Sequence, residues 1–138
     1  MIEINKKIFH DAIHGTITLS NIAIKIIDTP EFQRLRNIKQ LGSVYMVFSS
    51  ASHNRFEHSL GVAYLAKKIL ESIKQKQNEL VINDQDIINV EIAGLCHDLG
   101  HGPFSHIFDD LFLFKKYQDS EFRHHEERSC VILEKIVK

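Results

Sequence analysis

The sequence has 138 residues, of which 43% are hydrophobic and 25% are charged, and its formal net charge is -1 at pH 7. These values are typical of one ordinary globular domain, and they argue against a protein that binds nucleic acid through a strongly basic surface. Cys96 and Cys130 lie too far apart to indicate a disulfide framework or a thiolate zinc site. Since no apolar run approaches the ~18 residues of a membrane span, we expect a soluble protein of the cytoplasm or nucleus.

The first expected element is a short β-hairpin over residues 8–19, where apolar residues alternate around a turn at Gly15. A helix start follows at Thr29, which is suited to cap a helix whose first position is Pro30. This helix should run to about residues 36–39.

A long amphipathic helix is predicted over residues 55–73, because side chains recur at steps of three and four along one face: His58, Val62, Ala66, Ile69 and Ile73. His58 should therefore face the core. Another helix is expected to begin near Asn83 and to stop at residues 100–103, and its inward stripe would be Ile88, Ile92, Leu95 and Leu99. His97 and Asp98 then fall in its last turn.

Beyond Pro103 the pattern predicts an apolar helix over residues 104–114 and a final helix from about residue 122 to the end. Four aromatic side chains of the first of these are most simply interior packing residues: Phe104, Phe108, Phe112 and Phe114. Cys96 is most simply a core thiol. The predicted fold class is one mainly α-helical domain with a short N-terminal β-hairpin.

The density of histidine is the main chemical signal, since nine histidines occur and several lie beside a carboxylate. For any single histidine a hydrogen-bonded structural role is the commoner explanation. A carboxylate at the negative end of a helix is disfavoured, however, unless a cation compensates it, and Asp98 stands there. Neighbouring helix positions project about 100° apart, so His97 and Asp98 can reach one ion while His58 approaches it from the other helix. Mixed imidazole and carboxylate ligands suit iron, manganese, nickel, cobalt or zinc.

Two long words of sequence, HNRFEHSLGV at residues 53–62 and CHDLGHGPFSH at residues 96–106, resemble the HD-domain phosphohydrolase superfamily. The shorter words at residues 32–36 and 38–42 extend the match, so that it covers residues 8–126. Within the superfamily, the sequence is most similar to enzymes that combine SAM and HD domains. The resemblance implies an HD-domain helical core and the hydrolysis of a deoxynucleoside triphosphate (dNTP) to deoxynucleoside and triphosphate.

Carried over position by position, the resemblance implies a divalent metal held by three side chains: His58, His97 and Asp98. It places Arg55 beside the substrate phosphates as a binding and catalytic residue. Catalytic roles are also implied for three further histidines: His101, His106 and His125. His125 would protonate the leaving sugar oxygen. Gln40 and Leu41 resemble positions that contact the sugar and select its deoxy form.

The resemblance also implies assembly into a homo-oligomer and activation by a guanine nucleotide, with magnesium accompanying nucleotide phosphates. The matching allosteric positions are Lys7, Asp28, Gln33 and Arg36. An Asp carboxylate can accept hydrogen bonds from guanine N1 and N2, while an Arg can donate to O6 or N7. By spacing alone, the favoured explanation is structural: Asp28 precedes a helix cap, and Gln33 and Arg36 are solvated helix positions. His10 stands where the family has an asparagine, which leaves the choice of a second nucleotide open.

The family's fourth metal ligand is an aspartate on a later helix, and three candidates here lie too near Asp98 to replace it: Asp109, Asp110 and Asp119. We therefore expect residues 1–138 to be the N-terminal portion of a truncated HD domain, as a fragment, an isoform or a shortened gene product. One functional hypothesis is a metal-dependent dNTP triphosphohydrolase or a piece of one. The other is a non-catalytic module that binds nucleotide or a partner through its allosteric positions. An HD phosphodiesterase is a weaker third hypothesis, because the words that contain Arg36 and Gln40-Leu41 argue against it.

Overall fold

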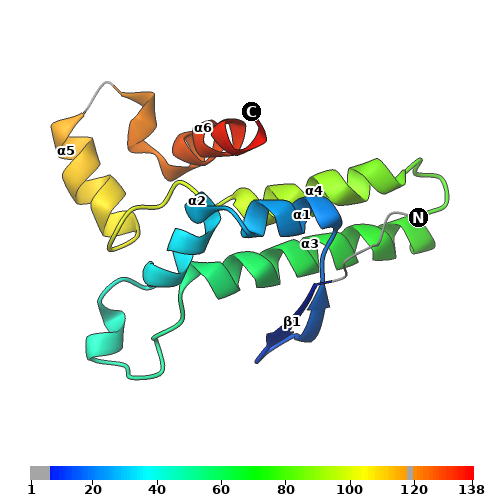
Figure 1. The fold of residues 1–138 in the computed structure, drawn as a ribbon, viewed down its shortest axis with the longest axis horizontal. Helices are drawn as coiled ribbons and strands as arrows, with labels where there is room; N and C mark the ends of the chain where they lie inside the picture. The colour runs from blue at the N-terminus through cyan, green and yellow to red at the C-terminus, as the bar shows by residue number, and fades with distance from the viewer. Residues whose placement is uncertain (1–6, 118–119) are drawn as a thin grey trace.

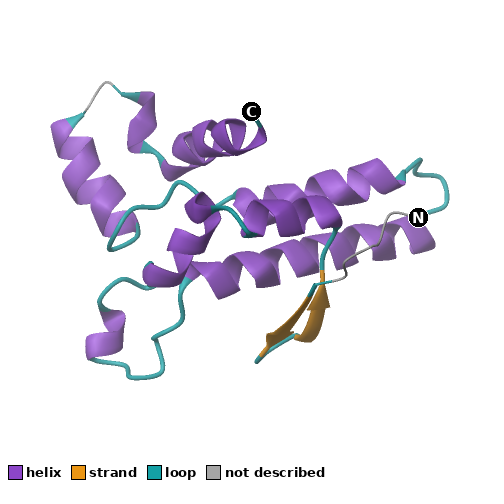
Figure 2. Cartoon of the chain, in the orientation of Figure 1, coloured by secondary structure: helices purple, strands orange, loops and turns teal. Residues whose placement is uncertain are grey.

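The computed structural model describes residues 7–117 and 120–138 as a mainly helical fold with one β-hairpin (Figures 1 and 2). The α-helices of these residues are α1 Asn21–Ile27, α2 Pro30–Gln33, α3 Arg55–Lys76, α4 Asp84–Cys96, α5 Phe114–Lys116 and α6 His125–Val137. Shorter turns of 3₁₀-helix are η1 Arg34–Asn37, η2 Val44–Met46 and η4 Glu121–Arg123, and η3 Phe108–Leu113 is a π-helix. The predicted fold class is confirmed.

The predicted hairpin is present as two antiparallel strands, β1 Ile8–Asp11 and β2 Gly15–Thr18. The Asp11 carboxylate closes the turn by accepting hydrogen bonds from the backbone of Ile13 and His14 at 2.9 and 2.8 Å. Gly15 has a φ of 72°, a conformation that suits glycine. Ile17 is fully buried, so one face of the hairpin joins the core.

Helix α1 was not predicted from the sequence, although Ser20 caps it by accepting from the backbone of Ala23. Glu91 of α4 fixes where this helix starts, because its fully buried carboxylate accepts from the Ser20 backbone and pairs with Lys67 at 3.1 Å. The start of α2 was predicted correctly, since Thr29 accepts from the backbone of Phe32 at 3.3 Å. Together, α2 and η1 cover the predicted extent of that helix.

Helices α3 and α4 form the long antiparallel pair that runs across Figure 1. Capping boxes fix both starts: the Asn54 side chain caps α3 with Glu57 reaching back, and Asn83 caps α4 with Asp86 reaching back. Gly94 lets the helices approach closely, because a Cβ on it would lie 3.2 Å from Ala63 Cα.

The predicted inward face of α3 is wrong in part. Its buried residues all lie in the first half of the helix and follow a different stripe: Arg55, Phe56, Ser59, Leu60, Gly61 and Ala63. Ile69 is 60% exposed, whereas it was expected in the core. Helix α3 contacts η1 and β2 as well as α4, and the residues that these contacts bury lie in its first half. The stripe predicted for α4 is confirmed at Leu95 and Leu99, which are fully buried.

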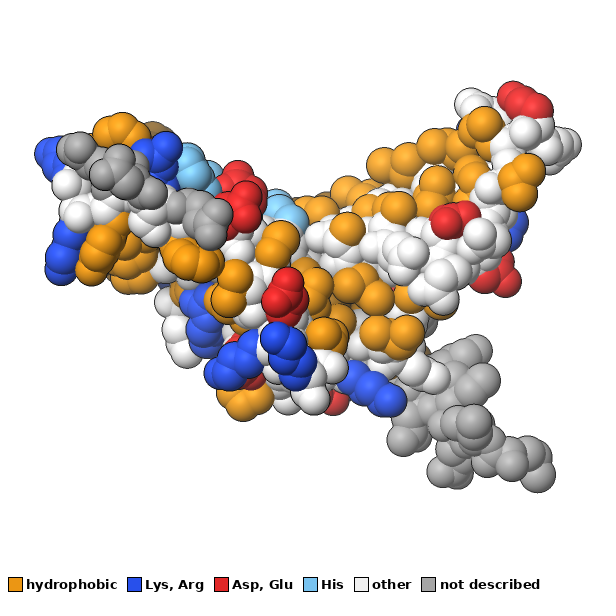
Figure 3. All heavy atoms as spheres, turned by 90° about the horizontal axis from the view of Figure 1, so that it is seen from above, with side chains coloured by type: hydrophobic (Ala, Val, Ile, Leu, Met, Phe, Trp, Pro, Cys, Tyr) orange, Lys and Arg blue, Asp and Glu red, His pale blue; other side chains and the backbone are white. Residues whose placement is uncertain are grey.

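The aromatic side chains after Pro103 are also not the interior cluster that we expected. Phe104 is 62% exposed, and Phe112 and Phe114 are 50% and 51% exposed. The segment of η3 and α5 projects away from the α3–α4 pair in Figure 1, so its outer face has no covering helix among residues 7–117 and 120–138. Orange apolar side chains are accordingly widespread on the surface shown in Figure 3.

The core instead gathers where α1, α2 and η1 meet the α3–α4 pair. It consists of Ile17, Leu19, Ala23, Ile26, Ile27, Phe32, Leu35, Ile38, Phe56, Leu60, Ala63, Leu95, Cys96 and Leu99. Burial raises the pKa of the Cys96 thiol to about 12, in agreement with the predicted core thiol. None of the helices among the described residues combines the length and apolar character needed to cross a membrane.

The close contact at Gly94 generates a stability prediction. Replacing Gly94 with Leu should destabilise the fold by about 1 to 3 kcal/mol, because the added side chain must separate α3 from α4. Ala93→Leu, one position away on the exposed face of α4, is the matched control and should change stability by less than ~0.5 kcal/mol. Urea unfolding followed by circular dichroism measures both. Equal stability of the two variants would show that the helices do not need this contact.

Candidate metal centre and its histidine surroundings

The first candidate ligand, His58, lies in the second turn of α3. Its Nε2 atom is 3.3 Å from His97 Nε2 and 3.4 Å from the Asp98 carboxylate. Burial lowers the pKa of His58, outweighing the opposing effect of the Asp98 charge. This keeps the imidazole neutral, which is the form that binds a metal.

The second candidate ligand, His97, caps the C-terminus of α4, which ends at Cys96 rather than at the predicted residues 100–103. Its Nδ1 atom donates to the Gly94 carbonyl at 2.7 Å. That bond fixes the ring and turns Nε2 towards His58. In metal-binding histidines, a hydrogen bond from the nitrogen that does not bind the metal commonly orients the ring in this way.

The third candidate ligand, Asp98, is 3% exposed. Its Oδ1 atom lies 3.3 Å from His97 Nε2 and 3.4 Å from His101 Nε2. Burial by itself would raise the pKa of Asp98, but the close approach of His101 and the charges of His97 and Arg55 outweigh it. The pKa is therefore held below its usual range, and the group is an anion ready to neutralise a cation.

The structure thus brings together the three predicted ligands, whose donor atoms all lie within 4.8 Å of one another. Two imidazoles and one carboxylate suit a first-row transition metal, so the residues present fit such an ion. Asp109 lies beside His125 and not beside these three candidate ligands. Asp119 falls outside the described residues. The group formed by the described residues therefore has three members.

Arg55 is buried directly beside this centre, where it forms an ion pair with Asp98. Its second terminal nitrogen donates to Ser105 Oγ at 2.9 Å. Ser105 in turn donates to the backbone carbonyls of Lys39 and Gln40 at 2.9 and 2.8 Å. Its backbone has a positive φ of 55°, which is uncommon for a residue with a side chain and typical of functional loops. The role of Ser105 was not foreseen from the sequence.

Three further predicted residues form a cluster of rings next to Asp98: His101, His106 and His125. The rings of His101 and His125 stack with centroids 3.7 Å apart, while His106 meets each of them edge-on. His101 is 1% exposed, and its two ring nitrogens have no hydrogen-bond partner. Burial lowers its pKa more than the neighbouring Asp98 raises it.

The position of His125 depends on two residues that sequence reasoning missed as functional. Asp109 lies 3.1 Å from His125 Nδ1, and Arg128 forms an ion pair with the same carboxylate. Asp109 follows His106 by three residues, which places both on one face of their helix. That spacing was the available signal, but Asp109 was considered only as a metal ligand.

The loop after α4 is fixed by backbone hydrogen bonds from distant residues. Arg34 of η1 donates to the carbonyls of Leu99 and His101, and Arg128 of α6 donates to the Gly100 carbonyl at 2.9 Å. Ser129 accepts from the Gly100 N–H at 2.7 Å. The loop therefore fixes the positions of the candidate metal centre and the histidine cluster relative to each other.

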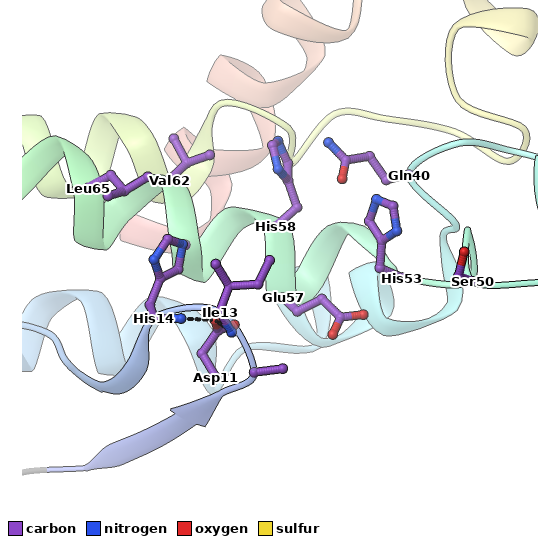
Figure 4. Close-up of a pocket in the computed structure, with 12 residues that line it drawn as sticks. Asp11, Ile13, His14, Gln40, Ser50, His53, Glu57, His58, Val62 and Leu65 are labelled. Atoms are coloured by element: carbon purple, nitrogen blue, oxygen red, sulfur yellow. Dashed lines mark hydrogen bonds between the residues drawn. The ribbon is translucent and has the colours of Figure 1, made fainter.

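A pocket of about 540 Å³ opens beside His58, between α3 and the hairpin turn. Figure 4 shows Gln40, His53 and His58 on one side of it and the turn residues Asp11 and His14 on the other. Gln40 therefore lines the same pocket as the candidate ligand His58. Leu41 is 46% exposed and is not one of the residues that line this pocket.

The predicted allosteric residues form a chain of contacts on the surface. Lys7 pairs with Asp28, whose preceding residue, Ile27, accepts from the Gln33 amide at 2.7 Å. Gln33 in turn accepts from Arg36 Nε at 2.8 Å. Asp28 remains 53% exposed, so its carboxylate is open to a ligand.

The sequence profile of the HD domain family matches residues 55–138, and the chain belongs to this family. Among curated proteins, the deoxynucleoside triphosphate triphosphohydrolase SAMHD1 of Danio rerio is 57% identical over 118 residues, which are 86% of this chain and 19% of that protein. SAMHD1 of Homo sapiens is 53% identical over 131 residues, covering 95% of this chain and 21% of that protein. The SAMHD1 homolog of Dictyostelium discoideum is 47% identical over 133 residues, covering 96% and 26%. These findings confirm the resemblance, although the chain spans about a fifth of the length of the first two relatives.

The tight loop after α4 generates the next prediction. A Cβ on Gly100 would lie 2.1 Å from the His125 carbonyl oxygen and 2.5 Å from the Ser129 nitrogen, so Gly100→Ala must push α6 away. We expect a loss of more than about 1 kcal/mol and faster proteolysis within α6. Cys130→Ala, at an exposed position of α6, is the control. If Gly100→Ala keeps the wild-type stability and cleavage pattern, the described docking of α6 is incorrect.

Proposed function

We propose that this chain forms part of a metal-dependent hydrolase that cleaves dNTPs to deoxynucleosides and inorganic triphosphate. The observation that carries the proposal is the convergence of His58, His97 and Asp98 beside the histidine cluster. Relatives that are 53% and 57% identical carry the name of this activity. The proposal is supported by this proximity, because such a reaction needs a cation to bind phosphate and groups such as imidazoles to transfer protons.

The metal would be held by His58, His97 and Asp98, and iron, manganese, zinc, nickel and cobalt all suit this donor set. When bound, such an ion polarises a phosphate oxygen and lowers the pKa of a water molecule. Magnesium would accompany the nucleotide phosphates.

The protein side chains orient the substrate around that centre. Arg55 offers a positive charge to the phosphates, and its tether to Ser105 fixes the direction of the guanidinium. Gln40 binds the sugar from the wall of the pocket beside His58, and Leu41 limits the space at the sugar from the adjoining position. Ribose, which is bulkier and more polar than deoxyribose, would therefore bind to this surface less tightly.

His125 is the proposed proton donor to the leaving 5′ oxygen of the sugar. Its Nδ1 atom is oriented by Asp109 at 3.1 Å, so Nε2 is the nitrogen available to the substrate. His101 and His106 flank the ring and stabilise charge on the phosphate. Their contacts make Asp109 a positioning residue for His125.

A second candidate function is a non-catalytic module that binds guanine nucleotide or a full-length partner. It is favoured by the chain of contacts from Lys7 through Asp28 to Arg36 and by a pocket of about 340 Å³ lined by Arg36 and His10. In a longer protein the same surface would act as an allosteric site that promotes homo-oligomer formation. The two functions are separable, because only the first releases triphosphate.

Triphosphate release tests the catalytic proposal. With manganese and GTP present, we expect the 138-residue chain to be more than about tenfold slower than full-length human SAMHD1, a gap above ~1.4 kcal/mol. The reason is that the described residues supply three metal ligands and a partial substrate pocket. Residual release should vanish in His97→Ala and persist in His124→Ala, an exposed neighbouring control. Release that His97→Ala leaves unchanged would refute the assignment, and no release at all would favour the binding module.

Guanine nucleotide binding is tested separately by thermal melting. GTP at 100 times its dissociation constant should stabilise the native state by about 2.7 kcal/mol, which raises Tm. Asp28→Ala should remove most of this shift, because it deletes the proposed acceptor for guanine N1 and N2. Asp110→Ala, which changes charge equally at an exposed position, should keep the shift. If both variants respond to GTP like the wild type, the proposed nucleotide site is wrong.

A further inference from the structure

The histidine cluster has the composition of a metal site in its own right. Ring nitrogens of His101, His106 and His125 lie within 4.8 Å of one another, as do the donors of the first centre. The two groups share no member, although Asp98 Oδ1 lies only 3.4 Å from His101 Nε2. They are therefore neighbouring but separate donor sets.

His101 provides an independent sign that a ligand is needed here. Its side chain is fully buried, and neither ring nitrogen has a hydrogen-bond partner. Its 3.4 Å contact with Asp98 is longer than an ordinary hydrogen bond. Buried polar atoms without partners are uncommon in native proteins and call for an explanation such as an ion.

The contact of His125 with Asp109 has the form found around metal-binding histidines. A carboxylate that accepts from one ring nitrogen fixes the tautomer and directs the other nitrogen towards an ion. The Asp109 carboxylate is itself held by Arg128, so it does not need to bind the metal directly. His125 is thus oriented before any ion arrives.

Access to the cluster is provided by His106, which is exposed at the start of the helix that continues into η3. An ion can meet this ring first and then reach His125 and the buried His101. Because the rings of His101 and His125 are stacked at 3.7 Å, the His125 ring must tilt about its contact with Asp109 to share one ion. This small rearrangement is available to a side chain at the first position of α6.

We propose that His101, His106 and His125 form a second divalent-metal site with a preference for ions that favour imidazole, such as Zn²⁺. The first centre differs because it contains a carboxylate and also suits harder ions such as Mn²⁺. The proposal of this second metal site does not depend on the proposed hydrolase activity. One consequence rests on the proposed function: Zn²⁺ here occupies the nitrogen that His125 needs for proton transfer and therefore inhibits hydrolysis.

Zn²⁺ titration of the purified 138-residue chain by calorimetry, with elemental analysis of the dialysed protein, tests the site. We expect about two ions per chain in the wild type and about one in His106→Ala. His58→Ala should also retain about one ion, now in the histidine cluster. His124→Ala is the matched control and should bind as many ions as the wild type, because this exposed histidine belongs to neither group.

Co²⁺ gives a second readout that does not depend on activity, because its visible absorption reports coordination by the protein. The band of the second ion should be lost in His106→Ala while circular dichroism shows an unchanged fold. One Zn²⁺ ion per wild-type chain, or the same stoichiometry in His106→Ala and wild type, overturns the second site. Such a result leaves the proposed hydrolase intact, since that proposal needs only the first centre.

Discussion

The close packing of α3 against α4 is the constraint on which the rest of the structure depends. Where Gly94 meets Ala63, the backbones approach so closely that an added Cβ would lie 3.2 Å from Ala63 Cα. The same turn of α4 presents the Gly94 carbonyl that orients His97 at 2.7 Å. Gly94 therefore takes part both in the close approach of the helices and in the orientation of a candidate ligand.

The loop after α4 connects the α3–α4 pair to the histidine cluster and fixes the position of that cluster. Its carbonyls are fixed by Arg34 and Arg128, and Gly100 allows the backbone of α6 to lie against it. The charges are also matched: Asp98 pairs with Arg55, and Asp109 pairs with Arg128. Each buried carboxylate thus has a cationic partner, which is the condition under which burying a charge is tolerated.

Local signals in the sequence predicted the parts of the fold that depend on neighbouring residues. Residues suited to helix starts located the beginnings of α2 and α4, the periodicity of residues 55–73 located α3, and the metal-ligand pattern predicted a group of side chains that the structure brings together. Long-range contacts could not be predicted in this way. The start of α1 depends on Glu91, which is 71 residues from Ser20, and Ser105 holds Arg55 from 50 residues away. The contact of Asp109 with His125 likewise joins residues of two different helices, and the spacing of Asp109 from His106 did not reveal it.

Hydrophobic periodicity misled where an apolar face has no covering element among the described residues. Ile69 and Phe104 are 60% and 62% exposed although their spacing is typical of a buried helix face. Periodicity shows which residues share a face, but the fold decides whether that face is covered. The predicted proximity of His58, His97 and Asp98 is confirmed, and ligand chemistry restricts residue types more strongly than packing does.

The central claim is that the α3–α4 contact builds one ion site from His58, His97 and Asp98. Binding of Mn²⁺ followed by electron paramagnetic resonance tests it most directly, because the carboxylate makes this the site that accepts a hard ion. We expect the wild type and Asp110→Ala to bind Mn²⁺ alike, and His58→Ala and Asp98→Ala each to lose at least about tenfold in affinity. Equal affinity in all four proteins would contradict the account.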